Sequence, residues 1–217
     1  MSELALQRRG ILCVVSGPSG SGKTTLCRRL SCEDEEAVYA ISATTRQPRT
    51  GEYDGTDYYF LSREDFEARA TRGEFLEYAE VHGNLYGTLK SEVLNHISAG
   101  RDVLMDIDVQ GAGLIRENSD RGIQDALVDI FILPRNEEDL LDRLRNRGTE
   151  NDDQLKLRLR NALDEMKHWD EYAYTIISGN KEEDFAIFQS MIESERCRSK
   201  RLKTVETTQL EQEELGL

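Results

Sequence analysis

Apolar and polar positions at the start of the chain predict a strand followed by a helix. Residues 11–15 form a continuous apolar run, which is typical of a strand buried on both faces. Leu26 and Leu30 lie four residues apart among Arg28 and Arg29, a spacing that predicts an amphipathic helix. A polar, glycine-rich stretch separates the two apolar segments, so the pattern indicates a strand, a loop and a helix.

The middle of the chain has the pattern of short strands. Apolar runs predict strands at residues 38–42, 58–61 and 74–81, with a polar, turn-rich segment after the first. Ser62 begins a capping box that predicts a short helix ending at Gly73, and residues 86–88 lead into a helix at about 89–98. We interpret residues 39–88 as a β-rich insertion that binds a ligand.

The second half of the chain returns to alternating strands and helices. Apolar runs predict strands at residues 102–106, 127–133 and 174–178. Helices are predicted from Asn136 to Gly148, over 152–169 and over 182–201, and the polar segment from Leu202 is expected to be frayed helix or disorder. The alternation predicts an α/β core formed by residues 1–38, 89–138 and 166–201, a lid at 139–165 and a tail at 202–217.

The composition of the chain limits the classes of molecule that it is expected to bind. The 217 residues are enough for one α/β domain with insertions, and 28 basic against 42 acidic residues give a net charge of −14. This charge argues against general affinity for nucleic acid or for an anionic membrane. Neither a membrane span nor a secretory signal is visible, so we expect a cytoplasmic location. The four cysteines have no metal-ligand spacing, and reduced thiols are expected.

The glycine-rich stretch at residues 17–24 reads GPSGSGKT, which matches G-x-x-x-x-G-K-T between a predicted strand and a predicted helix. Such a loop curls around phosphate oxygens and directs backbone N–H groups at them. Lys23 would reach the β and γ phosphates, and the Thr24 hydroxyl would bind magnesium. The alternative is a plain turn without a ligand, which needs neither the lysine nor the hydroxyl. The residues expected to bind ATP are Gly17, Pro18, Ser19, Gly20, Ser21, Gly22, Lys23, Thr24 and Thr25.

Asp106 ends a predicted apolar strand. A carboxylate at this position holds magnesium through water in many P-loop proteins. A carboxylate that merely faces solvent at the end of a strand is the alternative. The presence of Thr24 favours the magnesium site.

Several separate motifs in a fixed order resemble those of guanylate kinases, from about residue 9 to residue 191. The motifs are GPSGSGKT (17–24), SATTRQPR (42–49), GEYDGTDYYF (51–60), FLEY (75–78), NLYGT (84–88), MDIDVQG (105–111) and RLRNRG (143–148). The resemblance implies a three-layer P-loop NTPase fold with a central parallel sheet, a monophosphate-binding insertion and a helical lid. It also implies transfer of the γ-phosphoryl group of ATP to GMP, with Mg²⁺ as cofactor, by a monomer or homodimer that binds neither nucleic acid nor membrane.

A second anion site is needed if the acceptor is a nucleoside monophosphate. Arg46, Arg49, Tyr58 and Tyr86 offer two guanidinium groups and two phenols. The resemblance assigns these four residues, together with Glu52, to the GMP site. Taken one at a time, they could instead belong to a solvated loop with two core tyrosines.

Guanine presents N1–H and N2–H₂ donors that a carboxylate can accept in parallel, whereas adenine presents a bare N1 acceptor. We expect Glu77 to make this contact. Ser42 and Thr88 resemble the family's hydroxyls that donate to O6, and Asp108 resembles its second acidic contact to the base. The alternative for Glu77 is an exposed position on a strand, because Glu74 and Glu80 flank it.

Arg143, Arg147 and Arg158 resemble the lid arginines that close on the phosphates, and with Lys23 they are the expected catalytic residues. By composition alone they could belong to an ion-paired surface helix, because several acidic residues lie nearby. No general base is required, since the second pKa of the acceptor phosphate is about 6 and the group is largely a dianion at neutral pH.

One segment departs from the family pattern. Residues 178–180 are Ser-Gly-Asn where the family has Asn-Asp-Asp after the last strand, so the preference for the donor base is open. Two other functions compete. A guanylate-kinase-like interaction module would typically have lost parts of the P-loop, whereas Lys23, Thr24 and Asp106 are present here. A kinase of another phosphorylated ribose would not need Glu77 and its hydroxyl neighbours.

Overall fold

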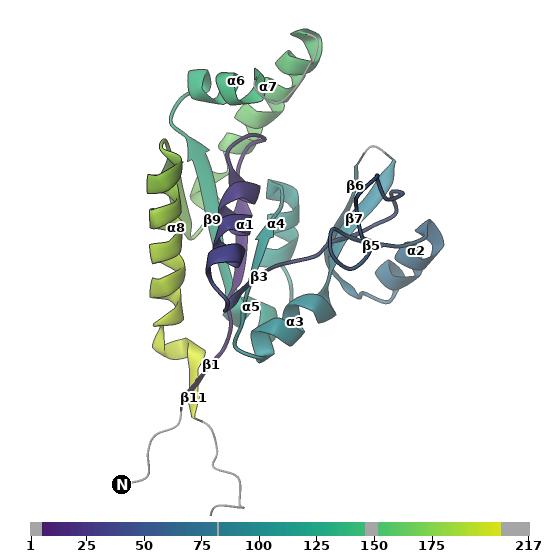
Figure 1. Ribbon diagram of the computed structural model, residues 1–217, viewed down its shortest axis with the longest axis vertical. Coiled ribbons are helices and arrows are strands. Elements are labelled where there is room, and N and C mark those ends of the chain that lie inside the picture. Colours follow the sequence, from purple (N-terminus) through teal and green to yellow (C-terminus); the bar gives the residue numbers. More distant parts are fainter. Residues whose placement is uncertain (1–5, 82, 146–151, 205–217) are drawn as a thin grey trace, which may run out of the picture.

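The computed structural model describes residues 6–81, 83–145 and 152–204. Its centre is a five-stranded sheet in the order β10-β9-β2-β8-β3, in which every pair of neighbours is parallel (Figure 1). The strands are β2 (Leu12–Ser16), β3 (Ala37–Tyr39), β8 (Asp102–Asp106), β9 (Leu127–Pro134) and β10 (Tyr174–Ser178). The predicted α/β class with a central parallel sheet is therefore confirmed.

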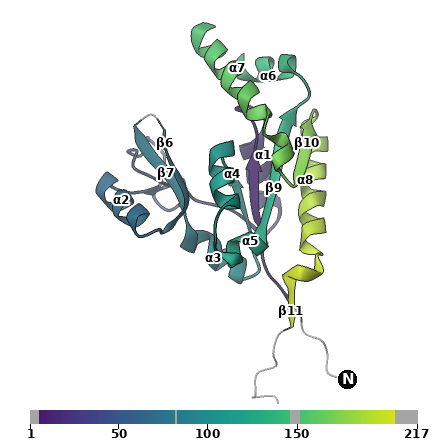
Figure 2. The same cartoon turned by 180° about the vertical axis from the view of Figure 1, so that it is seen from behind.

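Helices cover both faces of this sheet, which makes three layers (Figures 1 and 2). Alternate residues of β2 point to opposite faces: Cys13 and Val15 pack against α1 (Lys23–Glu33) and α8 (Lys181–Arg196). Leu12 and Val14 pack against the other layer, formed by α3 (Lys90–Ser98), α4 (Val109–Arg116) and α5 (Arg121–Ala126). Within the described ranges, no helix is long and apolar enough to cross a membrane.

A second sheet projects from one side of the core (Figure 1). Its order is β5-β4-β7-β6, and its elements are β4 (Ala43–Thr44), β5 (Tyr59–Phe60), α2 (Arg63–Thr71), β6 (Phe75–Val81) and β7 (Asn84–Leu89). Phe66 is fully buried and stacks on Phe75 with ring centroids 4.1 Å apart, which anchors α2 to the sheet. Tyr39, at which we expected the insertion to begin, pairs with Leu104 in the core sheet instead.

Two helices occupy the range in which we predicted a lid, α6 (Glu137–Arg145) and α7 (Asp152–Met166). Leu140 and Ala162 are buried between them, and Leu155, Leu159 and Leu163 pack against this pair. In Figure 1 the two helices lie at the top, beyond the end of β9, and the insertion projects from the right of the core. The expected helix stop at Gly148 lies outside the described residues.

Three elements differ from the sequence-based prediction. Residues 84–89 form β7 rather than a lead into a helix, because Gly87 lets the strand approach β6: a Cβ at Gly87 would lie 2.6 Å from the Tyr78 Cβ. The polar stretch after Asp106 contains α4 and α5. The sequence features that could have predicted these two helices are Asp108 and Asp120. Each is an N-cap whose side chain accepts hydrogen bonds from backbone N–H groups in the first turn.

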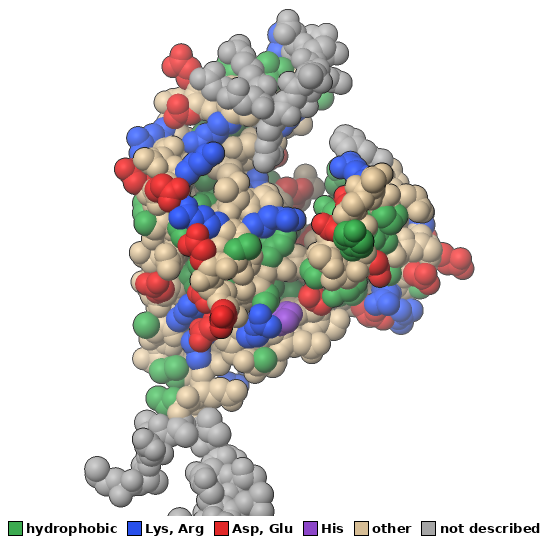
Figure 3. Space-filling model, in the orientation of Figure 1, with side chains coloured by type: hydrophobic (Ala, Val, Ile, Leu, Met, Phe, Trp, Pro, Cys, Tyr) green, Lys and Arg blue, Asp and Glu red, His purple; other side chains and the backbone are tan. Residues whose placement is uncertain are grey.

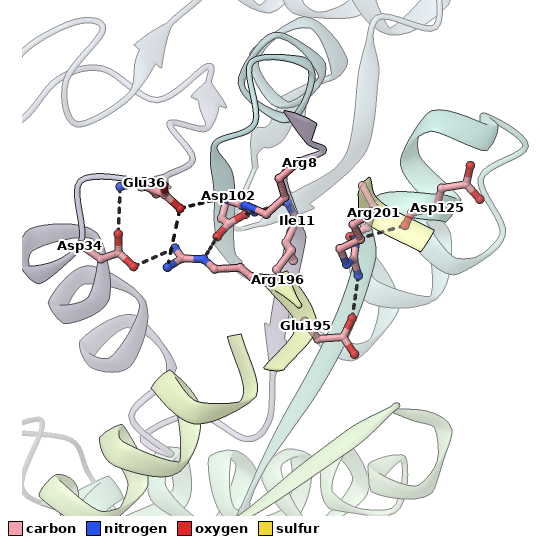
Figure 4. A network of polar contacts seen from close by, with 10 residues as sticks. Arg8, Ile11, Asp34, Glu36, Asp102, Asp125, Glu195, Arg196 and Arg201 are labelled. Carbon is pink, nitrogen blue, oxygen red and sulfur yellow. Dashed lines mark hydrogen bonds and ion pairs between the residues drawn. The ribbon is translucent and has the colours of Figure 1, made fainter. Parts of the chain in front are cut away.

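The ends of the described chain pair with each other. Helix α8 ends at Arg196 rather than at Arg201, and β11 (Leu202–Thr204) pairs antiparallel with β1 (Leu6–Arg8). The expected tail from Leu202 therefore begins as a strand, and residues 205–217 lie outside the described residues. The cause is Arg201, which is 1% exposed and donates to Glu195 at 2.7 Å and to the Asp125 carbonyl at 3.1 Å (Figure 4).

A second group of charges ties α8 and β1 to the sheet. Asp102 is fully buried and accepts from Arg8 at 2.5 Å, from Arg196 at 2.6 Å and from the Ile11 backbone N–H at 2.9 Å. Figure 4 shows Arg8 and Arg196 converging on this carboxylate. These contacts satisfy the buried carboxylate and position the start of β2, which leads into the glycine-rich loop.

Candidate active site

The glycine-rich loop joins β2 to α1 and curls through three glycines in the left-handed region. Gly17, Gly20 and Gly22 have φ values of 141°, 86° and 102°. At Gly17 a side chain is excluded twice over, by the backbone conformation and by space, since a Cβ would lie 2.4 Å from the Ile132 carbonyl oxygen. The loop therefore needs glycine here in order to turn sharply against β9.

The N-terminus of α1 has the features of an anion-binding site. Gly22 is its N-cap, and within the described residues α1 has neither a side-chain cap nor an acidic residue in its first turn. The Ser21 Oγ is buried and has no hydrogen-bond partner among the described residues. Lys23 Nζ donates to the Gly17 carbonyl at 2.6 Å and to the Pro18 carbonyl at 3.1 Å. The ammonium group therefore lies against the first two residues of the loop.

Thr24 and Asp106 meet beside this loop. The Thr24 hydroxyl donates to Asp106 Oδ2 at 2.5 Å, and the Tyr39 hydroxyl donates to the other carboxylate oxygen. Both residues border a cavity of about 270 Å³ that Gly20, Lys23 and Glu165 also line. A hydroxyl and a carboxylate are the oxygen ligands that Mg²⁺ prefers, so the residues present fit this ion.

Two lid arginines reach the loop. Arg143 Nη1 donates to the Ser21 carbonyl at 3.3 Å, and Arg158 Nη2 donates to Ser19 Oγ at 3.0 Å. These contacts bring two guanidinium groups to the loop that also holds Lys23. The third predicted arginine, Arg147, lies outside the described residues.

A second cavity, of about 430 Å³, lies between the core and the insertion. Figure 3 shows the molecule hollowed between the main body and the projecting insertion. Thr24 and Asp106 line this cavity as well as the smaller one, so the two cavities adjoin. Six of the predicted GMP-binding residues line it: Ser42, Tyr58, Glu77, Tyr86, Thr88 and Asp108.

Glu77 is half-buried in this cavity. Burial raises the pKa of its carboxyl to about 7, and the nearby Asp108 carboxylate acts in the same direction, while hydrogen bonds from Thr88 oppose the rise. Glu77 lies opposite Thr88 at a bulge between β6 and β7, and its Oε2 would lie 3.6 Å from a Cβ at Gly111. The absence of a side chain at Gly111 thus leaves open the space beside the carboxylate.

The remaining predicted base contacts surround Glu77. The Ser42 and Thr88 hydroxyl oxygens lie 3.5 Å apart. Asp108 caps α4 by accepting from the Gly111 N–H at 2.8 Å. The cavity lining therefore carries two hydroxyls and two carboxylates, with Glu77 and Thr88 on neighbouring strands of the insertion and Asp108 at the start of α4 in the core.

Arg46 packs against the rings of Tyr58 and Phe60 and is absent from the lining of this cavity in the described residues. It makes a two-pronged ion pair with Glu52, with N–O distances of 3.0 and 2.9 Å, and its guanidinium lies 5.4 Å from the centre of the Tyr58 ring. Tyr58 in turn packs edge-to-face with Tyr86. Arg49 is exposed, and its backbone N–H donates to Glu52. Glu52 therefore holds the side chain of Arg46 and the backbone of Arg49, and like both arginines it is absent from the cavity lining in the described residues.

Three residues at these cavities were not singled out from the sequence. Tyr39 and Arg28 line the larger cavity, with the Arg28 guanidinium 5.1 Å from the centre of the Tyr39 ring. Glu165 reaches the smaller cavity from α7, and burial raises the pKa of its carboxyl. Arg28 could have been predicted to lie near the site, because it is on the helix that follows the glycine-rich loop. Nothing in the local sequence marks Tyr39 or Glu165.

A parallel sheet that carries a phosphate-binding loop, together with two adjoining cavities of nucleotide size, defines a P-loop kinase of small phosphorylated substrates. The sequence model of one family, described as guanylate kinase, matches residues 9–195. The chain therefore belongs to the guanylate kinase family, and it is an ATP:GMP phosphotransferase.

Individual relatives agree with this assignment. The chain is 40% identical to a guanylate kinase of Clostridium perfringens over 203 residues, which cover 94% of this chain and 92% of the relative. It is 43% identical to one of Bartonella quintana over 201 residues, which cover 93% and 89%. The crystal structure of the Anaplasma phagocytophilum guanylate kinase superposes with a TM-score of 0.68 at 30% identity, covering 96% of this chain and 95% of that one.

Proposed function

We propose that the smaller cavity receives the phosphates of MgATP and that the larger cavity receives GMP, so that the γ-phosphoryl group passes directly between them to give ADP and GDP. One observation carries this proposal: Thr24 and Asp106 line both cavities. Phosphates bound on the two sides would then meet at these two residues. Such proximity is the main requirement of phosphoryl transfer between two bound nucleotides.

On the donor side, residues 17–25 bind the phosphates of ATP, with the backbone N–H groups of the non-proline residues as donors. Lys23 exchanges its bonds with the Gly17 and Pro18 carbonyls for phosphate oxygens. Arg143, Arg147 and Arg158 neutralise the charge that develops on the transferring group. The contacts of Arg143 and Arg158 with Ser21 and Ser19 support this role.

Thr24, directly through its hydroxyl, and Asp106, through water, would hold Mg²⁺. When bound, this ion would neutralise part of the negative charge of the phosphates. The Tyr39 hydroxyl donates to Asp106 and so keeps the carboxylate turned toward Thr24.

On the acceptor side, Arg46 and Arg49 bind the phosphate of GMP together with the hydroxyls of Tyr58 and Tyr86. Glu52 supports both arginines through the ion pair with Arg46 and the bond from the Arg49 N–H. Because Arg46 also packs on Tyr58, the charged and phenolic groups of this site are held together before the substrate arrives.

The base lies against Glu77, whose two oxygens accept from N1–H and N2–H₂ of guanine. Asp108 makes a second acidic contact, and the hydroxyls of Ser42 and Thr88 donate to O6. The proximity of these two hydroxyls, 3.5 Å apart, supports a shared target between them. Adenine would meet a carboxylate with its own N1 acceptor and would be rejected.

No residue has to abstract a proton in this reaction, because the acceptor phosphate is already ionised. The arginines of the lid also exclude water, which would otherwise accept the phosphoryl group.

The test is a coupled assay of ADP formation from ATP with GMP, AMP, CMP or UMP as acceptor. We expect turnover with GMP and only weak turnover with the other three, and loss of turnover when magnesium is chelated. Comparable rates with AMP and GMP would contradict the assignment of Glu77. Absence of turnover with every acceptor would favour a binding module that has kept the fold.

A further inference from the structure

A chain of three side chains joins the start of α8 to the lid. Arg143 of α6 donates through Nη1 to the Ser178 hydroxyl oxygen at 3.0 Å. The Ser178 hydroxyl in turn donates to Asp184 Oδ2 at 2.7 Å. Ser178 is the last residue of β10 and Asp184 lies in the first turn of α8, so the lid is connected to two elements of the core.

The direction of these hydrogen bonds is determined by the buried carboxylate. Ser178 is 1% exposed and Asp184 is 7% exposed. An ionised carboxylate only accepts hydrogen bonds, so the Ser178 proton must point at Asp184, which leaves the lone pairs of the hydroxyl for Arg143. Asp184 Oδ1 accepts from the Gly179 N–H at 3.1 Å, and both carboxylate oxygens are thereby held in place.

The same nitrogen of Arg143 donates to the Ser21 carbonyl in the phosphate-binding loop, at 3.3 Å. The guanidinium group therefore bridges the loop and the Ser178 hydroxyl. The contact with Ser178 is the shorter of the two, and its acceptor is polarised by a carboxylate, so it is the stronger constraint on Arg143.

We propose that Ser178 and Asp184 are positioning residues for phosphoryl transfer, which hold the Arg143 guanidinium at the phosphate-binding loop in the orientation that meets the transferring group. This inference rests on the proposed function, in which Arg143 stabilises the charge in transit. Ser178 and Asp184 act through Arg143 and are absent from the linings of both substrate cavities in the described part of the chain.

A purely structural role explains this arrangement less well. Apolar side chains would fill the space beneath the lid without the cost of burying a carboxylate. Ser178 also lies in the segment that departs from the family pattern, so the contact cannot be assumed in relatives with asparagine at this position. The buried pair is explained by the side chain that it holds, Arg143, which also contacts Ser21.

The test is a double-mutant cycle with Ser178→Ala and Arg143→Ala, measured as kcat and as KM for GMP. Because a hydrogen bond to a charged group is lost, we expect Ser178→Ala to lower kcat by about tenfold. KM for GMP should stay unchanged, since the acceptor cavity is untouched. Arg143→Ala should lower kcat further, and adding Ser178→Ala to it should have no additional effect. Ser190→Ala is the matched control, because its hydroxyl bonds only the Ala186 carbonyl of the same helix.

A second variant guards against misfolding. Asp184→Asn keeps an acceptor oxygen for Ser178 but removes the charge, so it should retain more kcat than Asp184→Ala, and the same cycle can be built from it. Circular dichroism and thermal melting identify any variant that does not fold.

The outcomes separate the two proposals. Independent, multiplicative losses for Ser178→Ala and Arg143→Ala, or an unchanged kcat in both Ser178→Ala and Asp184→Ala, would overturn the positioning role. A normal kcat in Arg143→Ala would instead overturn the catalytic role of Arg143.

Discussion

In the proposed complex with GMP, the side chain of Glu77 decides which base is bound. Its carboxylate is half-buried beside Thr88 and Asp108, and both burial and the second carboxylate raise its pKa to about 7. The cost of keeping Glu77 ionised in this position is recovered when two donors of guanine satisfy its oxygens. A base without these donors leaves the carboxylate unpaired, and selectivity follows from that difference.

Glu77→Gln retains the size of the side chain and replaces one acceptor with a donor. We expect a higher KM for GMP and a weaker preference over AMP, with a smaller effect on kcat, because the base contacts persist from the ground state to the transition state. Steady-state kinetics with both acceptors measure this. Glu80→Gln is the control, since Glu80 lies exposed on the same strand and pairs with Arg63. A lower kcat with unchanged KM for GMP would assign Glu77 to the chemical step.

The raised pKa of Glu77 predicts a pH dependence of GMP binding. Only the ionised carboxylate accepts both donors, and the ionised fraction falls as the pH drops through about 7. For a group with this pKa that must be ionised, KM for GMP should rise by about tenfold between pH 8 and pH 6. The same titration on Glu77→Gln removes this contribution and leaves the part due to ionisation of the phosphate of GMP. Identical pH profiles for the two proteins would refute the role of ionisation.

The insertion and the lid carry the side chains proposed to bind phosphate, and each has a small hydrophobic core of its own. Phe66 and Phe75 form a core within the insertion, and Leu140 and Ala162 form a separate one between the lid helices. Each element can therefore move as a unit without opening the central sheet.

We expect residues 43–89 and helix α7 to approach the phosphate-binding loop when both substrates are bound. Binding would add contacts between these elements and the core, and exchange of their amide protons with solvent should slow. Hydrogen exchange with and without a bisubstrate analogue measures this. Unchanged exchange in both elements would refute closure, and the central strands β2 and β9 serve as the internal control.

Helix α7 offers a matched pair of arginines. Arg158 reaches Ser19 in the phosphate-binding loop, whereas Arg160 is exposed on the same helix. Loss of a charge that acts on the transferring group can cost on the order of 10³-fold in rate, so Arg158→Ala should lower kcat strongly. Arg160→Ala should leave kcat close to that of the unaltered protein. Equal effects of the two substitutions would show that α7 contributes only general positive charge.

The two groups of buried charges in Figure 4 connect the ends of the described chain to the central sheet. Arg201 and Glu195 are 1% and 2% exposed in their side chains and lie 2.7 Å apart. Burial raises the pKa of Glu195, but hydrogen bonds from Arg201 and Tyr174 outweigh it and the net shift is downward. The pair holds β11 against β1 and so links the end of the chain to the fold of the core.

Arg201→Leu should destabilise the protein by about 3 kcal/mol, because the buried Oε2 of Glu195 loses its donor, while Arg198 and Tyr174 donate only to Oε1. The double substitution Arg201→Leu with Glu195→Leu should recover much of this loss, since the unpaired charge is gone. Urea unfolding measures both. Arg198→Ala is the control, because Arg198 binds the same carboxylate from an exposed position and should cost about 1 kcal/mol or less. A single substitution as mild as this control would show that the buried pair contributes little.

Features that depend on neighbouring residues were predictable from the sequence. The strands β2, β8 and β9 are rich in apolar residues because both of their faces are covered, and such segments can be recognised without knowing which strands they pair with. The phosphate-binding loop is equally local, since its glycines, Lys23 and Thr24 are adjacent in the chain. The positions of these strands, the loop and the family were accessible for this reason.

Features that depend on contacts between distant residues required the structure. Strand β7 exists because Gly87 fits against Tyr78, and Leu202 belongs to a strand because Arg201 finds a buried carboxylate. The same holds at the active site, where Asp106 meets Tyr39 and Arg143 meets Ser178. In each case the free energy comes from a partner many positions away in the chain, which no local pattern of polar and apolar residues can encode.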